Sequence, residues 1–205
     1  MKVGIDFDNT IVSYDSLFYK VALGLGVIPE EIDKTKISVR DFLRKSNKND
    51  VWTSIQGTVY GEKMIEAEVY EGFIEFIKFL KSKKFDFCII SHKTKYPFIG
   101  KKTNLHNAAL NWIHKFLNID NQILIKDELI YFEDTKELKV DRIISEKCDV
   151  FIDDLPEIFE IPSFPDFVNK YLFDPNGTYV GNRFLSFSSW LEIKNEFEKC
   201  VIKKK

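Results

Sequence analysis

The chain has 205 residues, which is enough for one domain with a full hydrophobic core and a small insertion. Its composition, 44% hydrophobic and 30% charged, is typical of a globular protein, and the formal net charge of -2 argues against a dedicated nucleic-acid-binding protein. No apolar run approaches the roughly 20 residues that cross a bilayer. No signal peptide is visible, because Asp6 interrupts the first apolar stretch. We therefore expect a cytoplasmic protein with no membrane partner.

The cysteines and histidines indicate neither a disulfide framework nor a zinc site. Cys88, Cys148 and Cys200 are too few for such a framework, and no two have metal-ligand spacing. We expect Cys88 and Cys148 to be buried in the core. His106 and His114 fall on a predicted helix, where a structural role is expected.

The first strand is predicted at residues 3–5, which are apolar and directly precede Asp6 and Asp8. Successive side chains of a strand point to opposite faces, so both carboxylates would share one face with Phe7 turned away, provided that the chain stays extended. Two neighbouring carboxylates repel each other unless a cation lies between them or one is protonated. Mg²⁺ is suited to such a place because it prefers oxygen ligands. The same residues also fit a simple polar turn after a strand.

Residues 14–70 read as helical and irregular, without a strong strand. Helical spacing predicts a first helix that ends near Gly24 and Gly26, and Ser38 with Asp41 resembles a capping box that opens a second helix. Residues 44–50 are polar and predict a loop before a short helical turn. The apolar residues expected to face inward are Leu17, Phe18, Val21, Ala22, Leu25, Val39, Phe42, Leu43, Val51, Trp52 and Ile55.

From Gly72 onward the pattern alternates between strands and helices. Strands are predicted at 85–90, 123–125, 130–132, 149–152 and 168–173, and helices at 73–84, 105–116, 136–147 and from 189 onward. Such β-α-β units produce a parallel sheet. The predicted fold is therefore α/β, with a Rossmann-like parallel sheet flanked by helices and a small helical cap insertion. The expected domains are 1–13 with 71–205 as the core, and 14–70 as the cap.

Polar side chains follow three of the predicted buried strands. In an open α/β sheet, ligands bind beyond the carboxyl ends of the strands, so these residues are expected to meet at one site. Single polar residues often follow strands because they begin turns. Three polar strand ends in one chain, two of them carboxylate pairs, favour a common site over turns alone. The residues are Asp6 and Asp8, Ser91 and His92, and Asp153 and Asp154.

The same residues carry a resemblance to the haloacid dehalogenase-like (HAD) superfamily. The stretches Asp6-Phe-Asp8-Asn-Thr10, Ile90-Ser91 and Phe151-Ile-Asp153-Asp154 stand in the order of that superfamily's motifs. The resemblance covers about residues 1–12 and 70–175, while 14–70 corresponds to a cap inserted after the first strand. Residues 151–154 also resemble the 5'-nucleotidase-like branch.

This resemblance implies roles for the matching residues. Asp6 would be the nucleophile that forms an aspartyl-phosphate, and Asp8 would protonate the leaving oxygen and later deprotonate water. Ser91 would hydrogen-bond a phosphoryl oxygen. Thr10 and His92 are the other candidate contacts to the phosphate or the substrate.

The resemblance also implies a Mg²⁺ site and a catalytic lysine. The ion would be held by Asp6, the backbone carbonyl of Asp8, and Asp154, with Asp153 binding through water or orienting the site. A lysine that offsets the phosphoryl charge normally lies near the start of the preceding helix. Lys139 fits this best, and Lys136 is the alternative. The acidic residue after Pro156, Glu157, is either an outer ligand or a helix-start charge.

Two further features bear on the substrate. The loop after Ser91 carries Lys93, Lys95, Lys101 and Lys102, which indicates either a solvated loop or a substrate with more than one negative group. In the cap, aromatic residues could stack on a base or a sugar, although core packing is the more common use. These aromatic residues are Phe18, Tyr19, Trp52 and Tyr60.

The sequence therefore predicts a Mg²⁺-dependent phosphatase that hydrolyses a small phosphorylated metabolite through an aspartyl-phosphate. A sugar phosphate and a nucleoside monophosphate both fit. The superfamily's dehalogenases lack the second acid, so Asp8 favours phosphoryl transfer. One alternative is a catalytically silent relative that acts as a binding or regulatory protein. Another is a nucleic-acid end-processing phosphatase, which the acidic net charge disfavours.

Overall fold

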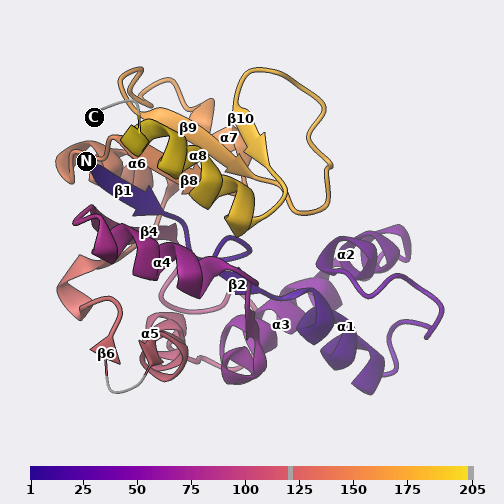
Figure 1. The fold of residues 1–205 in the computed structure, drawn as a ribbon. Coiled ribbons are helices and arrows are strands. Elements are labelled where there is room, and N and C mark those ends of the chain that lie inside the picture. The colour runs from indigo at the N-terminus through magenta and orange to yellow at the C-terminus, as the bar shows by residue number, and fades with distance from the viewer. Residues whose placement is uncertain (120–121, 203–205) are drawn as a thin grey trace.

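A computed structural model describes residues 1–119 and 122–202, and for 200–202 the backbone alone. Its centre is a six-stranded parallel sheet in the order β10-β9-β8-β1-β4-β7 (Figure 1). Parallel strands require crossovers, which the intervening helices supply. The strands are β1 (Lys2–Ile5), β4 (Asp86–His92), β7 (Ile130–Glu133), β8 (Val150–Asp153), β9 (Asn169–Phe173) and β10 (Leu185–Phe187).

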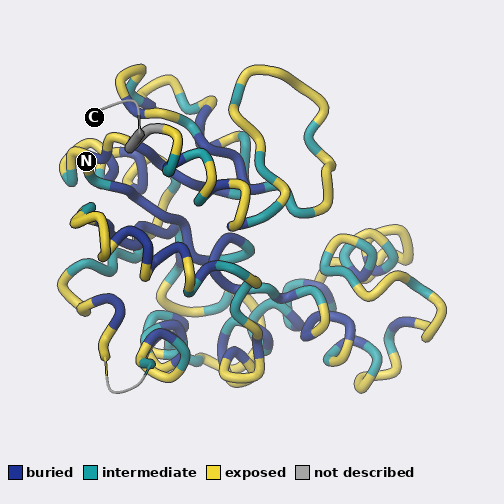
Figure 2. The backbone as a smooth tube through the Cα atoms, in the orientation of Figure 1, coloured by how far each residue is buried: buried dark blue, intermediate teal, exposed yellow. Residues whose placement is uncertain are grey.

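Helices cover both faces of this sheet, so the central strands are buried on two sides (Figure 2). Alternate residues of β4 belong to separate apolar clusters, because successive side chains of a strand point to opposite faces. Ile89 packs with α4, α5 and α8, whereas Cys88 and Ile90 pack with α6 and α7. These helices are α4 (Phe73–Ser82), α5 (Leu105–Phe116), α6 (Lys136–Ser145), α7 (Pro156–Phe159) and α8 (Trp190–Ile202).

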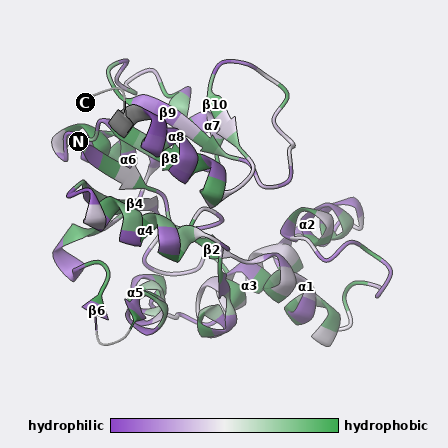
Figure 3. Ribbon diagram, in the orientation of Figure 1, coloured by the Kyte–Doolittle hydropathy of each residue, from purple (hydrophilic) through white to green (hydrophobic). Residues whose placement is uncertain are grey.

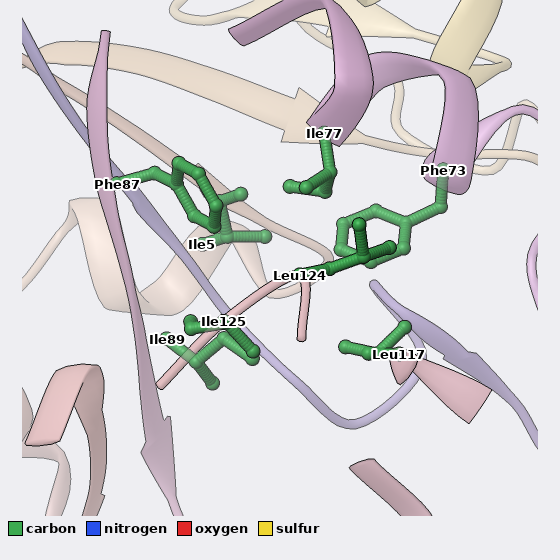
Figure 4. Close-up of a pocket in the computed structure, with 8 residues that line it drawn as sticks. All are labelled: Ile5, Phe73, Ile77, Phe87, Ile89, Leu117, Leu124 and Ile125. Atoms are coloured by element: carbon green, nitrogen blue, oxygen red, sulfur yellow. The ribbon is translucent and has the colours of Figure 1, made fainter. Parts of the chain in front are cut away.

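Figure 4 shows the apolar packing on the face of the sheet to which Ile89 points. The crevice there is lined by apolar side chains alone and has no room for a water molecule. It is a packing feature of the core and not a ligand site. Its lining residues are Ile5, Phe73, Ile77, Phe87, Ile89, Leu117, Leu124 and Ile125.

The predicted helical insertion is present and lies to one side of the sheet (Figure 1). It contains α1 (Asp15–Gly24), α2 (Lys36–Lys45), α3 (Asn49–Tyr60) and the 3-10 helix η1 (Met64–Glu66). The chain leaves and re-enters through two short antiparallel strands, β2 (Val12–Ser13) and β3 (Glu68–Val69). This pairing lies next to the predicted domain boundary, although the division of the chain into two domains remains a prediction.

Several local predictions for the insertion were wrong. The N-cap of α2 is Thr35, whose Oγ1 accepts a hydrogen bond from the Ser38 amide at 3.1 Å, so Ser38 with Asp41 is not the capping box. The polar residues 44–50 are a loop only at 46–48, because α2 and α3 extend into both ends. Leu25 follows the end of α1 and is 59% exposed. Hydropathy alone did not reveal these boundaries, since α2 is a largely polar helix with one narrow apolar stripe (Figure 3).

One predicted strand differs from the structure, and one observed strand was not predicted. Residues 122–123 form β6 (Gln122–Ile123), which pairs with β5 (Asn118–Ile119) outside the main sheet, while Leu124 and Ile125 are buried without strand structure. A short 3-10 helix, η2 (Asp127–Leu129), follows. Strand β10 had no sequence signal.

No helix within the described residues is both long and apolar enough to span a membrane.

Candidate active site

The three strands with polar ends are neighbours in the sheet. Strand β1 pairs with β8 on one side and β4 on the other, so their carboxyl ends open into a single cavity of about 340 Å³. The cap, the loop after β4, Leu105 of α5 and Lys139 of α6 form most of the remaining wall. Of the predicted site residues, the following line it: Asp6, Asp8, Ser91, His92, Lys139 and Asp154.

A tight turn after β1 presents both aspartates to this cavity. The strand ends at Ile5, and the Phe7 carbonyl accepts hydrogen bonds from the Ile11 and Val12 amides. Phe7 is fully buried and points away from the cavity, against Trp112 and Phe132. A turn after β1, and not a continuation of the strand, therefore positions Asp6 and Asp8.

Lys139 joins two of the carboxylates. Its ammonium lies 2.6 Å from Asp6 Oδ1 and 2.6 Å from Asp153 Oδ2, and its side chain is 1% exposed. Burial acts to lower the pKa of Lys139, but Asp153 and Asp6 outweigh burial and raise that pKa above its usual value. Lys139 is therefore a permanent buried cation beside Asp6. Lys136 instead pairs with Glu157 at the surface, at 3.1 Å.

Asp6, Asp153 and Asp154 form a group that could hold a metal ion. One carboxylate oxygen from each lies within 4.8 Å of the others. Burial raises the pKa of Asp153 to about 7 and raises the pKa of Asp154 well above its usual value, and the neighbouring carboxylates add to both effects. Ionisation of all three carboxylates is therefore unfavourable unless a further cation is bound. An all-oxygen donor set with this excess suits a hard divalent cation such as Mg²⁺.

Thr10 supports this group from behind. It is fully buried, and its Oγ1 lies 3.3 Å from Asp6 Oδ2 and 3.5 Å from Asp154 Oδ1. Its carbonyl accepts a hydrogen bond from Trp190 Nε1 at 3.1 Å, which ties the turn to α8. Thr10 therefore contacts two of the three carboxylates, and its expected contact to the phosphate or the substrate remains a prediction.

Asp8 is held by two residues that the sequence analysis did not connect with it. The Tyr14 hydroxyl donates a hydrogen bond to Asp8 Oδ1 at 2.5 Å. Lys93 Nζ lies 3.0 Å from Asp8 Oδ1 and 2.7 Å from Oδ2, and Lys93 is 4% exposed. The sequence analysis gave a solvated loop as one of two interpretations of the lysines after Ser91. Because Lys93 is buried, that interpretation is wrong for this residue. Lys93 directly follows β4 and Ser91-His92, which is the one sequence signal that could have revealed it.

Ser91 and His92 line the cavity from the end of β4. Within the described chain, Ser91 Oγ is the buried side-chain polar atom without a hydrogen-bond partner. Leaving such an atom unpaired is costly, so a ligand oxygen is expected there. His92 Nε2 lies 3.2 Å from the Asp134 carbonyl oxygen, and burial lowers the pKa of His92.

The other histidines lie outside the cavity lining. His106 Nε2 lies 2.7 Å from the carbonyl oxygen of Lys93 and so supports the start of the lysine-bearing loop. His114 Nε2 lies 2.7 Å from Asp127 Oδ1 at the surface. Cys88 and Cys148 are buried and not in a disulfide, while the side chain of Cys200 lies outside the described residues.

The cap contributes a polar wall that sequence reasoning did not foresee. Lys36 begins α2, and Thr53, Gln56 and Tyr60 lie on α3; all four line the cavity. Of the cap aromatics considered above, Tyr60 alone is in the cavity lining. The other three are buried in the core, with the Phe18 and Trp52 ring centroids 4.9 Å apart.

No family model and no curated protein matches the sequence. Solved structures match it over nearly the whole chain. A HAD family hydrolase from Deinococcus radiodurans R1, with bound phosphate and sodium, has a TM-score of 0.58 at 16% identity and covers 97% of this chain and 95% of that one. An archaeal beta-phosphoglucomutase from Pyrococcus sp. strain ST 04 has a TM-score of 0.57 at 15% identity and covers 100% and 99%.

A HAD-superfamily hydrolase from Ehrlichia chaffeensis has a TM-score of 0.55 at 15% identity and covers 98% of this chain and 97% of that one. The protein therefore has the fold of the HAD-superfamily hydrolases, as the sequence motifs predicted. None of these three structures is named as a 5'-nucleotidase, so the resemblance of residues 151–154 to that branch remains a prediction.

Proposed function

We propose that the protein is a Mg²⁺-dependent phosphatase that hydrolyses a small phosphorylated metabolite through an aspartyl-phosphate on Asp6. The observation that carries this proposal is the buried Lys139, 2.6 Å from both Asp6 and Asp153 at the floor of a cavity. A lysine that stays charged beside a carboxylate can stabilise the negative charge that develops on a phosphoryl group attached there. The bound phosphate in the structurally similar hydrolase from Deinococcus radiodurans agrees with this choice.

In the first step, an Asp6 carboxylate oxygen attacks phosphorus, and the bond from phosphorus to the leaving oxygen breaks. Asp8 donates a proton to that oxygen, so the product leaves as an alcohol. In the second step Asp8 takes a proton from a water molecule, which attacks phosphorus and releases inorganic phosphate and the Asp6 carboxylate. The Tyr14 and Lys93 contacts hold the ionised Asp8 carboxylate that the second step needs. For the first step Asp8 must enter protonated, so one of its oxygens exchanges its contact with the Lys93 ammonium for a proton.

The unpaired Ser91 hydroxyl would donate a hydrogen bond to a phosphoryl oxygen. Asp6, Asp154 and the backbone carbonyl of Asp8 would hold Mg²⁺, with Asp153 turned toward Lys139 as a support. When bound, the ion would offset negative charge on the phosphoryl group and on the carboxylates.

The test is phosphate release from p-nitrophenyl phosphate and a panel of phosphorylated metabolites, with Mg²⁺ and with chelator. Asp6→Asn should abolish turnover, because an amide is not a nucleophile at phosphorus. Asp86→Asn, at an exposed carboxylate at the start of β4, is the matched control and should retain activity. Wild-type turnover by Asp6→Asn would contradict the mechanism.

A further inference from the structure

Two cysteines that the proposed reaction does not use meet in the interior of the core. Cys88 lies in β4, and Cys148 lies in the short connection between α6 and β8. Both belong to the apolar cluster on the face of the sheet that α6 and α7 cover, where they are 0% and 1% exposed. Their thiols hydrogen-bond to each other. The fold therefore brings together two sulfur atoms that are far apart in the chain.

A glycine makes room for this contact. Strand β1 lies between β4 and β8, and its Gly4 is the direct register partner of Cys88. A Cβ added at Gly4 would lie 2.9 Å from Cys148 Sγ. The Cys148 sulfur thus occupies the place over β1 that a side chain at position 4 would fill. Because Gly4 has no side chain to stand between them, the two thiols can approach each other across β1.

The two thiols differ in their surroundings. The hydrogen bond from Cys88 lowers the pKa of Cys148; burial acts in the opposite direction, and the nearby Lys2 ammonium lowers that pKa again. The hydrogen bond to Cys148 and burial both raise the pKa of Cys88. Since the thiolate is the reactive form of cysteine, Cys148 is the better nucleophile of the pair. Cys88 is placed to attack the Cys148 sulfur once that sulfur has been oxidised.

The pair lies close to the surface at the amino end of β1, away from the strand ends that form the candidate active site. Lys2 begins β1, and its ammonium lies 2.5 Å from Glu146 Oε2, with both side chains partly exposed. Cys148 stands between Lys147 and Asp149, which are both exposed. A small oxidant therefore needs only a local opening of the connection between α6 and β8 to reach Cys148.

We propose that Cys88 and Cys148 form a redox-active dithiol, a modification site that a hydroperoxide such as hydrogen peroxide converts to a disulfide. The Cys148 thiolate attacks one peroxide oxygen, so that a sulfur–oxygen bond forms, the oxygen–oxygen bond breaks, and the departing hydroxide takes up a proton to become water. The Cys88 sulfur then attacks the Cys148 sulfur, and the hydroxyl on Cys148 leaves with the Cys88 proton as a second water. Two electrons pass from the two sulfurs to the peroxide.

The disulfide would tie β4 to the segment that leads into β8. It would close a loop of about 60 residues and so restrict the unfolded chain, which is expected to stabilise the folded protein. The inference does not rest on the proposed phosphatase function, because neither cysteine lines the active-site cavity. The oxidised protein is therefore expected to be the more stable form whether or not the chain hydrolyses a phosphate ester.

The test uses the full chain carrying Cys200→Ser, so that two thiols remain. The folded protein is treated with a small excess of hydrogen peroxide, then denatured and alkylated. Mass spectrometry should find a loss of two hydrogens, no alkylation, and a cross-linked pair of peptides that contain Cys88 and Cys148. Dithiothreitol should reverse the change. The melting temperature of the oxidised protein should exceed that of the reduced protein by about 5 °C or more.

Single variants in the same background show which sulfur reacts first. In Cys88→Ala, peroxide should leave Cys148 as a sulfenic acid, which dimedone traps. In Cys148→Ala, Cys88 should react about tenfold more slowly or less. Lys2→Met should slow disulfide formation several-fold, whereas the control Lys78→Met, at an exposed position of α4, should leave the rate unchanged. Melting temperatures establish that each variant folds.

Two results would overturn the dithiol. One is that both cysteines remain fully alkylated after peroxide treatment, in buffer and also in urea below the unfolding transition, where local opening is more frequent. The other is a disulfide that forms only in the unfolded chain or lowers the melting temperature, since such a link would not fit the fold. Equal reactivity of Cys88→Ala and Cys148→Ala would overturn the assignment of Cys148 as the attacking thiol.

Discussion

Lys93 Nζ lies 2.7 Å from Asp8 Oδ2, and the Lys93 side chain is almost completely buried. The same ammonium lies 4.9 Å from the ring centroid of Tyr60 on the cap. Lys93 thus connects the proposed proton-transfer residue of the core with the end of helix α3. The pair links the orientation of Asp8 to the position of the cap.

We expect Lys93→Met to lower kcat for phosphate release by about 10- to 100-fold, because general acid–base catalysis depends on the position of the proton-transfer group. Mg²⁺ affinity should change little, since Lys93 forms no salt bridge with Asp6, Asp153 or Asp154. Lys95→Met, two residues along the same loop, is the control and should keep the wild-type rate. A Lys93→Met variant with unchanged kcat would remove the positioning role.

Lys139 and Lys136 lie three residues apart on α6 but should contribute very differently to stability. Lys139→Met leaves Asp6 and Asp153 buried without their cation, which is expected to cost about 3–5 kcal/mol of unfolding free energy in the absence of metal. Lys136→Met breaks an exposed pair with Glu157 and should cost at most about 1 kcal/mol. Urea denaturation with chelator measures both. Equal losses would mean that the buried contacts do not stabilise the fold.

Stability of the metal-free protein should fall as the pH rises toward neutral. Asp153 has a pKa of about 7 in the folded protein and an ordinary value of 3.8. A carboxyl group whose pKa is raised by folding stabilises the fold below its unfolded pKa. That contribution is lost as the pH rises through about 7.

Mg²⁺ should reverse this loss, because metal binding favours the ionised carboxylates. The increase in melting temperature on adding Mg²⁺ should therefore be larger at pH 8 than at pH 5. Asp154→Asn should remove most of the increase. A Mg²⁺ effect that is independent of pH, or that survives in Asp154→Asn, would argue against a metal site at this group.

Two glycine substitutions test how closely α3 packs on the loop after β4. A Cβ at Gly57 would lie 2.9 Å from the Ile99 carbonyl oxygen and 2.9 Å from Pro97 Cβ, so Gly57→Ala should destabilise the protein and raise KM. At Gly24, on α1, nothing lies within 4 Å of the added Cβ. Because Gly24 is the last residue of α1, Gly24→Ala should be neutral or stabilise the protein by at most about 0.5–1 kcal/mol through helix propensity. A denaturation midpoint of Gly57→Ala equal to or above that of the wild type would contradict the close packing at Gly57.

The positions of the strand-end aspartates were predictable because the signal is local. Short buried strands read as continuous apolar runs, and the residue that ends each run is visible in the chain. The expected parallel arrangement then places Asp6, Ser91 and Asp153 at one edge of the sheet. The parallel α/β sheet and the helical insertion were predictable on this basis, and the resemblance of the motifs implied the HAD fold.

The two lysine candidates on α6 show where local patterns become insufficient. Lys136 and Lys139 are both compatible with the start of that helix. The structure turns Lys139 toward Asp6 and Asp153 and Lys136 toward Glu157. The direction depends on how the helix is rotated against the sheet, which is set by the packing of Val140 and Ile143 and not by the lysines themselves.

By itself the sequence determined the strand ends, the order of the motifs and the presence of an inserted helical segment. Only the tertiary structure paired Asp8 with Lys93 and Tyr14, left the Ser91 hydroxyl without a partner among the described residues, and brought Lys36 of the cap into the cavity. These relations join residues whose separation along the chain carries no periodic signal. They arise when buried charges and polar groups are brought together by packing, because each must then find a partner or be left to a ligand.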